Sequence, residues 1–140
     1  MNNETEHLLA TLKSKQKFSE YIDNEPEYSD NYTLGNHLSL LLEKKQLEKS
    51  NVIRQSNLDR VYGYQIFSGL KIPSRDKVLA IALGMSLSLE ETQQLLKISN
   101  QPQLYVKKYR DSIIIFSLHK QLGIFKANEL LFDMGEPIIE

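Results

Sequence analysis

The amino-acid sequence predicts an all-α fold, for three reasons. Apolar residues recur at the three- and four-residue spacing of an amphipathic helix in almost every segment. No segment alternates between apolar and polar residues over a useful length, so nothing predicts a half-buried strand. Residues that commonly cap helices stand just before the apolar segments. The 140 residues are enough for one domain, or for a small domain with additions.

An acidic N-terminal part is predicted for residues 1–32. Residues 5–22 carry a loose apolar stripe that includes Leu8, Leu12 and Ile22, which favours a helix. The next stretch, DNEPEYSDNY, is acidic, contains proline and has no apolar period, which is typical of a linker. The N-terminus lacks a basic start followed by an apolar stretch, so we expect no secretory signal.

Two helices are predicted at the start of the central region. Thr33 is suited to cap the first helix, whose apolar stripe consists of Leu34, Leu38, Leu41 and Leu42. The second helix is short and covers residues 48–56, with Val52 and Ile53 inward. Asn57 fits the turn that follows, because asparagine tolerates the left-handed backbone conformation.

Three further helices are predicted before residue 100. Asp59 is a good N-cap for a helix that runs to about Ser68 and is stopped by Gly69. Ser74 is expected to cap the next helix, which runs to about Gly84 with Val78, Leu79, Ala82 and Leu83 inward. The fifth helix begins after a capping-box pair, Ser88 and Glu91, and ends near Ser99.

A repeat predicts the structure of the C-terminal region. The segment from Arg75, RDKVLAIALGMSLSLEETQQLLKISNQP, matches the segment from Arg110, RDSIIIFSLHKQLGIFKANELLFDMGEP, without a gap. Leucines, the Arg-Asp pair and a proline recur 35 residues apart. Residues 110–135 are therefore expected to form a second helical hairpin, which makes the apolar run 113–116 a helix rather than a strand. The alternative is a chance likeness between two amphipathic hairpins.

Charge is distributed unevenly along a chain of net charge −1. Residues 33–77 hold eight Lys/Arg and four Asp/Glu, whereas residues 1–32 hold three Lys and seven Asp/Glu. A local excess of positive charge is what one DNA-facing surface requires, although a solvated patch has the same composition.

The segment LEKSNVIRQSNLDRVYGYQIFSGLKIPSRDKVLAIALGMSLSLEETQQLL resembles the lambda-repressor-like (Cro-type) helix-turn-helix DNA-binding family. The resemblance covers roughly Thr33–Ser99. In this family a glycine ends the third helix and Pro-Ser opens the fourth, as Gly69, Pro73 and Ser74 do here. It implies a five-helix helix-turn-helix domain over residues 33–100. We therefore expect an all-α protein with an N-terminal helix and linker (1–32) and an added C-terminal helical hairpin (101–140).

The resemblance also implies which residues contact DNA. The second helix would lie across the phosphate backbone and the third would enter the major groove. The family's contact positions correspond to Lys49 on the second helix and to Arg60, Val61, Tyr64 and Gln65 on the third. Arg60 is suited to guanine and Gln65 to adenine. Tyr62 and Tyr64 carry hydroxyls within reach of DNA, or are partly buried with the hydroxyl at the surface, and Lys71 is suited to a phosphate.

Several positions depart from the family pattern. Lys49 replaces the usual glutamine, and Ile53 replaces a small alanine at the crossing of the second and third helices. Gly63 stands where an aliphatic core residue is common, at a cost of about 1 kcal/mol relative to alanine. We expect a tyrosine to cover the gap or the helix to pass close to a neighbour. Leu42 and Phe67 replace an Arg–Glu pair, which predicts an apolar contact in its place.

No pattern in the sequence indicates catalysis or a bound cofactor. The chain has no cysteine, its three histidines lack ligand-like spacing, and there is no glycine-rich phosphate loop or nucleophile elbow. The longest apolar run is far too short for a membrane span. We therefore expect a cytoplasmic protein that is not an enzyme, holds no metal and does not enter a membrane.

The sequence thus supports two hypotheses. The first is a sequence-specific transcriptional regulator that binds double-stranded DNA as a homodimer. The alternative is an adaptor that keeps the helix-turn-helix only as a scaffold and binds another protein through the third helix or the C-terminal hairpin. The basic and aromatic cluster 105–110 fits contact with DNA flanks, a partner, or simple cover for the core.

Overall fold

The computed structural model describes residues 32–140, and the predicted helix over 5–22 and the acidic linker lie outside these residues. The described part contains seven α-helices and no strand, so the all-α prediction is confirmed. The helices are α3 (Leu34–Lys45), α4 (Lys49–Gln55), α5 (Arg60–Phe67), α6 (Arg75–Gly84), α7 (Leu89–Ile98), α8 (Tyr109–His119) and α9 (Gly123–Asp133). None of these helices is long and apolar enough to cross a membrane.

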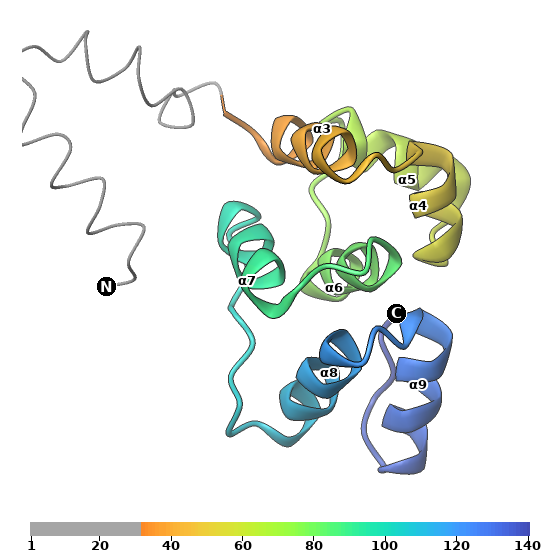
Figure 1. The fold of residues 1–140 in the computed structure, drawn as a ribbon, viewed down its shortest axis with the longest axis vertical. Coiled ribbons are helices and arrows are strands. Elements are labelled where there is room, and N and C mark those ends of the chain that lie inside the picture. The colour runs from red at the N-terminus through yellow and green to blue at the C-terminus, as the bar shows by residue number, and fades with distance from the viewer. Residues whose placement is uncertain (1–31) are drawn as a thin grey trace, which may run out of the picture. The chain divides into compact units, whose positions relative to one another are not determined.

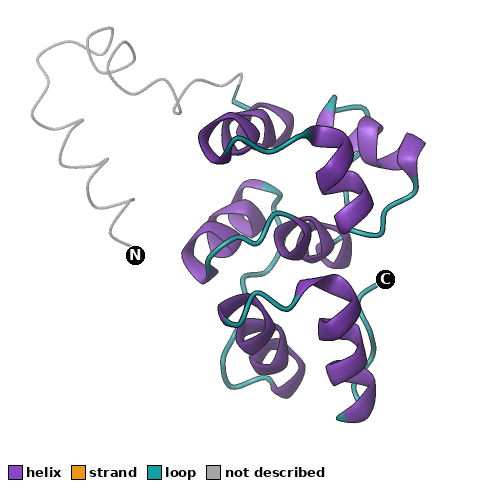
Figure 2. Cartoon of the chain, turned by 45° about the vertical axis from the view of Figure 1, so that its right-hand side comes forward, coloured by secondary structure: helices purple, strands orange, loops and turns teal. Residues whose placement is uncertain are grey.

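The helices form three tiers, which Figures 1 and 2 show from two sides. The first tier contains α3, α4 and α5, the second α6 and α7, and the third α8 and α9. Because α4 packs on α6 and α3 on α7, the first tier covers one side of the second. Because α6 also packs on α8 and α9, the third tier covers the other side. Residues 33–140 form one compact unit.

Side-chain caps fix where four of the helices begin. The Thr33 hydroxyl accepts from the Asn36 N–H, and the Asp59 carboxylate accepts from the Tyr62 N–H. Ser74 caps α6, and Ser88 forms the predicted capping box with Glu91. All four caps were predicted from sequence, since each depends on residues only three positions apart.

The turns at helix ends follow one pattern. Gln46, Ser86 and Gln121 adopt the left-handed conformation after the first helix of each tier, with φ between 53° and 55°. Asn57 does so after α4, as predicted, and Gly69 ends the α5 region with φ of 86°. In each case the next N–H groups return to carbonyls of the last helical turn, which satisfies the helix end.

The two repeated hairpins are joined by reciprocal ion pairs. The Arg75 guanidinium donates to both carboxylate oxygens of Asp111, at 3.1 and 2.9 Å. The Arg110 guanidinium donates in the same way to Asp76, at 3.1 and 3.0 Å. Each arginine thus binds the aspartate of the other repeat. Exchange in both directions relates the hairpins by an approximate two-fold axis rather than by the translation of a solenoid.

The chain segment after each hairpin follows the same two-fold rule. Arg75 also donates to the carbonyls of Pro102 and Gln103, and Arg110 donates to those of Pro137 and Ile138. Burial acts to raise the pKa of the Asp111 carboxyl, but hydrogen bonds from Arg75 and from the Tyr105 N–H outweigh it and hold that pKa below its usual value.

Candidate nucleic-acid interface

One face of α5 is exposed and the opposite face is packed against the protein. Arg60, Val61 and Tyr64 are exposed, with 64% of Val61 and 36% of Tyr64 accessible to solvent. Residues 60, 61, 64 and 65 lie within about 140° of one another around the helix. Gly63, Ile66 and Phe67 are buried against the α3 and α4 side. The helix α5 therefore exposes both polar and apolar side chains to solvent, while packing of its opposite face holds it in place.

The close approach of α5 to α4 depends on Gly63. A Cβ atom at position 63 would lie 2.6 Å from Cγ2 of Ile53, which is closer than real Cβ contacts. Ile53 is 3% exposed, so it has little room to move. The large side chain of Ile53 on α4 therefore fills the space that the missing side chain of Gly63 leaves on α5. The expectation that the helix passes close to a neighbour at Gly63 is confirmed.

Arg60 and Tyr64 form a pair on the exposed face. The Arg60 guanidinium carbon lies 6.0 Å from the centroid of the Tyr64 ring, which is within cation–π distance. A shallow pocket of about 330 Å³ adjoins them and is lined by Ser50, Ile53, Arg54, Leu58, Arg60 and Tyr64. Arg54 brings a second guanidinium to this pocket from the end of α4. Its place in the site was missed from the sequence, where it stands out only as a basic residue near Lys49.

The remaining predicted contact residues lie around this face rather than on it. Gln65 is half-buried at the edge of the exposed stripe. Tyr62 is half-buried against the core, with the Lys77 ammonium 5.9 Å from its ring centroid. Lys49 is half-buried at the start of α4, where its ammonium lies 5.9 Å from the Phe67 ring centroid. Lys71 is exposed in the loop after α5.

The structure thus brings Arg60, Val61 and Tyr64 together on one surface, with Gln65 at its edge. Tyr62 points back toward the packed side, where it contacts Lys77, and Lys49 folds toward Phe67. Lys77 was not among the predicted site residues, since its position three residues after a cap gave no signal for contact with α5.

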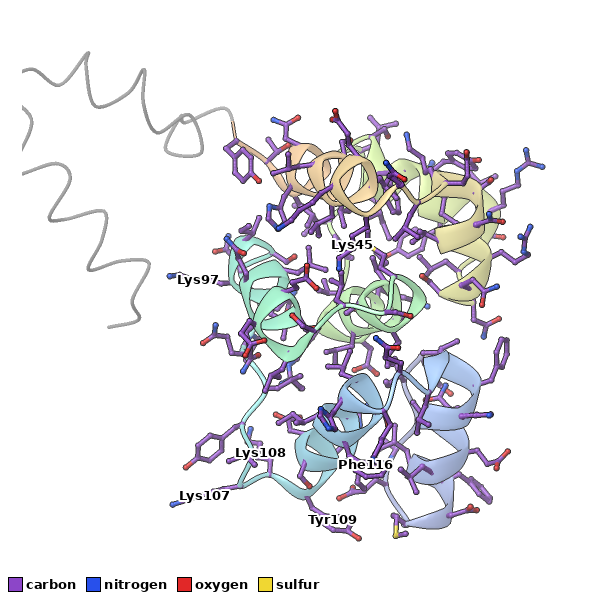
Figure 3. The ribbon with its side chains drawn as sticks, in the orientation of Figure 1. Lys45, Lys97, Lys107, Lys108, Tyr109 and Phe116 are labelled. Carbon is purple, nitrogen blue, oxygen red and sulfur yellow. The ribbon has the colours of Figure 1, made fainter. Side chains whose placement is uncertain are left out.

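Leu42 and Phe67, which the sequence predicts to form an apolar contact, both lie in the core. Leu42 is 9% exposed and Phe67 is 4% exposed, and both belong to the continuous hydrophobic core. An ion pair links α3 to the second tier: Lys45 reaches toward α7 and its ammonium lies 3.0 Å from Glu91 (Figure 3). Burial acts to raise the pKa of Glu91, but the hydrogen bonds from Ser88 and Lys45 leave that pKa below its usual value.

No group of three or more His, Asp or Glu side chains among residues 32–140 is arranged to hold a metal ion. Burial lowers the pKa of His37, which lies on α3 and is 6% exposed. Comparison of the chain with protein-family models, with curated proteins and with solved structures found no match.

Proposed function

We propose that the protein is a sequence-specific DNA-binding regulator in which α3 to α7 form a lambda-repressor-like helix-turn-helix domain. In this proposal α4 lies across the DNA backbone and α5 enters the major groove. One observation carries it: α5 turns Arg60, Val61 and Tyr64 to solvent while its other face is packed. A recognition helix needs this arrangement, because its exposed side chains must reach the base edges while the packed face keeps the helix folded.

The side chains on α5 suggest a division of roles. Arg60 has the planar fork that binds the O6 and N7 atoms of guanine, and it lies within cation–π distance of Tyr64. Val61 offers an exposed branched apolar surface, which suits the methyl group of thymine. Gln65 is assigned to adenine.

Phosphate contacts are assigned to residues around α5. Lys71 is exposed in the loop after the helix, and Arg54 and Lys49 come from α4. The hydroxyl of Tyr64 is assigned to a phosphate oxygen at the rim, whereas Tyr62 packs against the core beside Lys77. Such contacts set the position of α5 but carry no sequence information. Binding should therefore weaken steeply with salt for every DNA sequence.

Selection of bound sequences from a random DNA pool tests this proposal. We expect enrichment of one motif, and Arg60→Ala should weaken binding to it by about 1–3 kcal/mol and relax the preference at one base pair. Lys97→Ala is the control, because Lys97 is exposed on α7, outside the proposed interface. If no motif is enriched, or if Arg60→Ala binds the motif as well as the wild type does, the proposal is wrong.

The alternative, a protein-binding adaptor, is favoured by the loop after α5. Leu70 is 75% exposed and Ile72 is 87% exposed, so two large aliphatic side chains stand in water beside the proposed DNA-facing helix. An apolar protein surface would cover them better than phosphates would. Retention on heparin or on mixed genomic DNA at low salt distinguishes the two functions. Clean flow-through on both columns favours the adaptor.

A further inference from the structure

The two-fold repeat allows equivalent surfaces of the two hairpins to be compared residue by residue. Ile81 on α6 is 1% exposed, whereas its counterpart on α8, Phe116, is 48% exposed. Ser99 after α7 is 7% exposed, whereas its counterpart after α9, Met134, is 49% exposed. The same face is therefore covered in the first hairpin and open in the second, and the open residues are the larger ones.

The difference follows from the order of the tiers. The α6–α7 hairpin lies between the first tier and the α8–α9 hairpin, so helices cover it on two sides. The α8–α9 hairpin lies at the end of the stack (Figures 1 and 2). Its outer face has the side chains of an internal tier without the tier that would cover them.

This outer face is an apolar groove, which we call the α8–α9 groove. Its volume is about 340 Å³ and its lining consists of Tyr109, Ser112, Ile113, Phe116, Leu130 and Met134. No charged side chain is among the lining residues. An apolar patch of this kind on a folded protein marks a contact surface, because water solvates it poorly.

The charged residues near the groove are separated along its length. Lys120 lies at one end, with its ammonium 5.9 Å from the Phe116 ring centroid, and Lys126 lies one turn before Leu130 on α9. Asp133 and Glu136 flank Met134 at the other end.

Two further lysines lie near Tyr109, at the acidic end, but on the other side. Lys107 points away from α9 (Figure 3). Lys108 lies near Asp111, whose pKa it helps to lower and whose carboxylate binds Arg75 of the second tier. The groove therefore has a basic end and an acidic end.

We propose that the α8–α9 groove binds a second copy of this chain, groove to groove, with the helices of the two copies antiparallel. A two-fold axis in the plane of the contact then places Asp133 and Glu136 of each copy opposite Lys120 and Lys126 of the other. A parallel arrangement would bring like charges together and is disfavoured. Phe116, Tyr109 and Met134 would be buried in the contact, where large side chains contribute most to association. The proposal does not depend on DNA binding.

Sedimentation equilibrium of the full chain over a wide concentration range tests the groove. We expect a monomer–dimer equilibrium in the wild type, and Phe116→Glu should raise the dissociation constant by about tenfold or more. Phe125→Glu is the matched control, because Phe125 is 67% exposed on the same hairpin but does not line the groove. Circular dichroism checks the fold of each variant, and Met134→Glu gives a second probe of the same surface.

Charge reversal tests the antiparallel orientation. Lys120→Glu and Asp133→Lys should each weaken the dimer, and the variant that carries both changes should regain affinity, because each copy then offers both reversed charges to the other. A monomeric wild type at every concentration overturns the proposal, as does a dimer that Phe116→Glu and Met134→Glu leave unchanged. A double variant no tighter than the single variants overturns the antiparallel arrangement.

Discussion

Gly63 and Ile53 show how two unusual residues explain each other. Each of the two residues differs from the one that is common at its position in the family that the chain resembles. The sequence did not reveal that they contact each other, because they are ten positions apart on different helices. The structure places Ile53 where any side chain at position 63 would stand. Caps such as Asp59 were predictable because their partner is three residues away, whereas this contact depends on how α4 crosses α5.

Gly63→Ala tests this contact. Alanine should favour the helix by about 1 kcal/mol. We nevertheless expect a net loss of about 1–3 kcal/mol in the free energy of unfolding, since the new methyl group overlaps a buried side chain. Urea unfolding measures the change.

The matching control uses the smaller partner. In an Ile53→Ala background the overlapping atoms are absent, so Gly63→Ala should become neutral or stabilising. Equal losses in both backgrounds would mean that overlap with Ile53 is not the reason for the cost of a side chain at position 63.

The proposed contact of Val61 with DNA leads to a second prediction at the residue scale. If α5 reads DNA, the exposed valine should contact a thymine methyl group. Replacing one thymine of the selected motif with uracil should then weaken binding about fourfold, the effect of one buried methyl group. The same replacement should have no effect on Val61→Ala, and fluorescence anisotropy measures both. If no uracil position distinguishes the two proteins, Val61 contacts no thymine methyl group.

At the scale of elements, the repeat predicted that a second hairpin exists but not how the two hairpins meet. The Arg-Asp pair was visible twice in the sequence, 35 residues apart. A repeated Arg-Asp pair is equally compatible with three arrangements of ion pairs. They could form within each hairpin, from each hairpin to the next in one direction, or in both directions across a two-fold axis. Only the packing of α6 against α8 and α9 decides among these arrangements, and it produces the exchange of partners.

The two ion pairs are equivalent in chemistry but not in burial, which allows a matched comparison. The side chain of Asp111 is 4% exposed, whereas that of Asp76 is 27% exposed. Asp111→Ala leaves Arg75 without its buried partner and should cost about 3 kcal/mol or more. Asp76→Ala should cost about 1 kcal/mol, because the Asp76 carboxylate is itself partly exposed to water in the folded protein. Similar costs at both positions would show that burial does not set the strength of these pairs.

The Asp111 pair also predicts a dependence on pH. Because the pKa of Asp111 is lower in the folded protein than its usual value, its contribution to stability is fully present above the unfolded-state pKa of about 3.9. That contribution is lost as pH falls through the lower folded-state pKa. Between about pH 5 and pH 2 the wild type should therefore lose more unfolding free energy than Asp111→Asn. Parallel stability curves for the two proteins would contradict the assigned pKa direction.

At the scale of the whole molecule, α6 is the element on which all three tiers depend. Its six residues from Val78 to Leu83 are all buried, and α4, α7, α8 and α9 pack around it. The apolar period predicted only one inward stripe on this helix. Ala80 and Ile81, outside that stripe, are buried as well, at 4% and 1% exposed. The spacing of apolar residues along a sequence identifies one buried face of a helix. It could not predict that helices of two tiers would bury α6 from two sides.

The last prediction concerns the loop that leads into the third tier. Tyr105 and Val106 are 52% and 66% exposed, so this loop contributes little apolar burial of its own. Six glycine and serine residues inserted between Val106 and Lys107 should lower the melting temperature by no more than about 5 °C, because lengthening a surface loop costs little entropy. Ending the chain at Gln103 should abolish the cooperative transition, since it exposes the second side of α6 and removes Asp111 from Arg75. Calorimetry of the two variants separates the effect of a longer loop on the melting transition from the effect of losing the third tier. A truncated chain that still melts cooperatively near the wild-type temperature would mean that the first two tiers are stable alone.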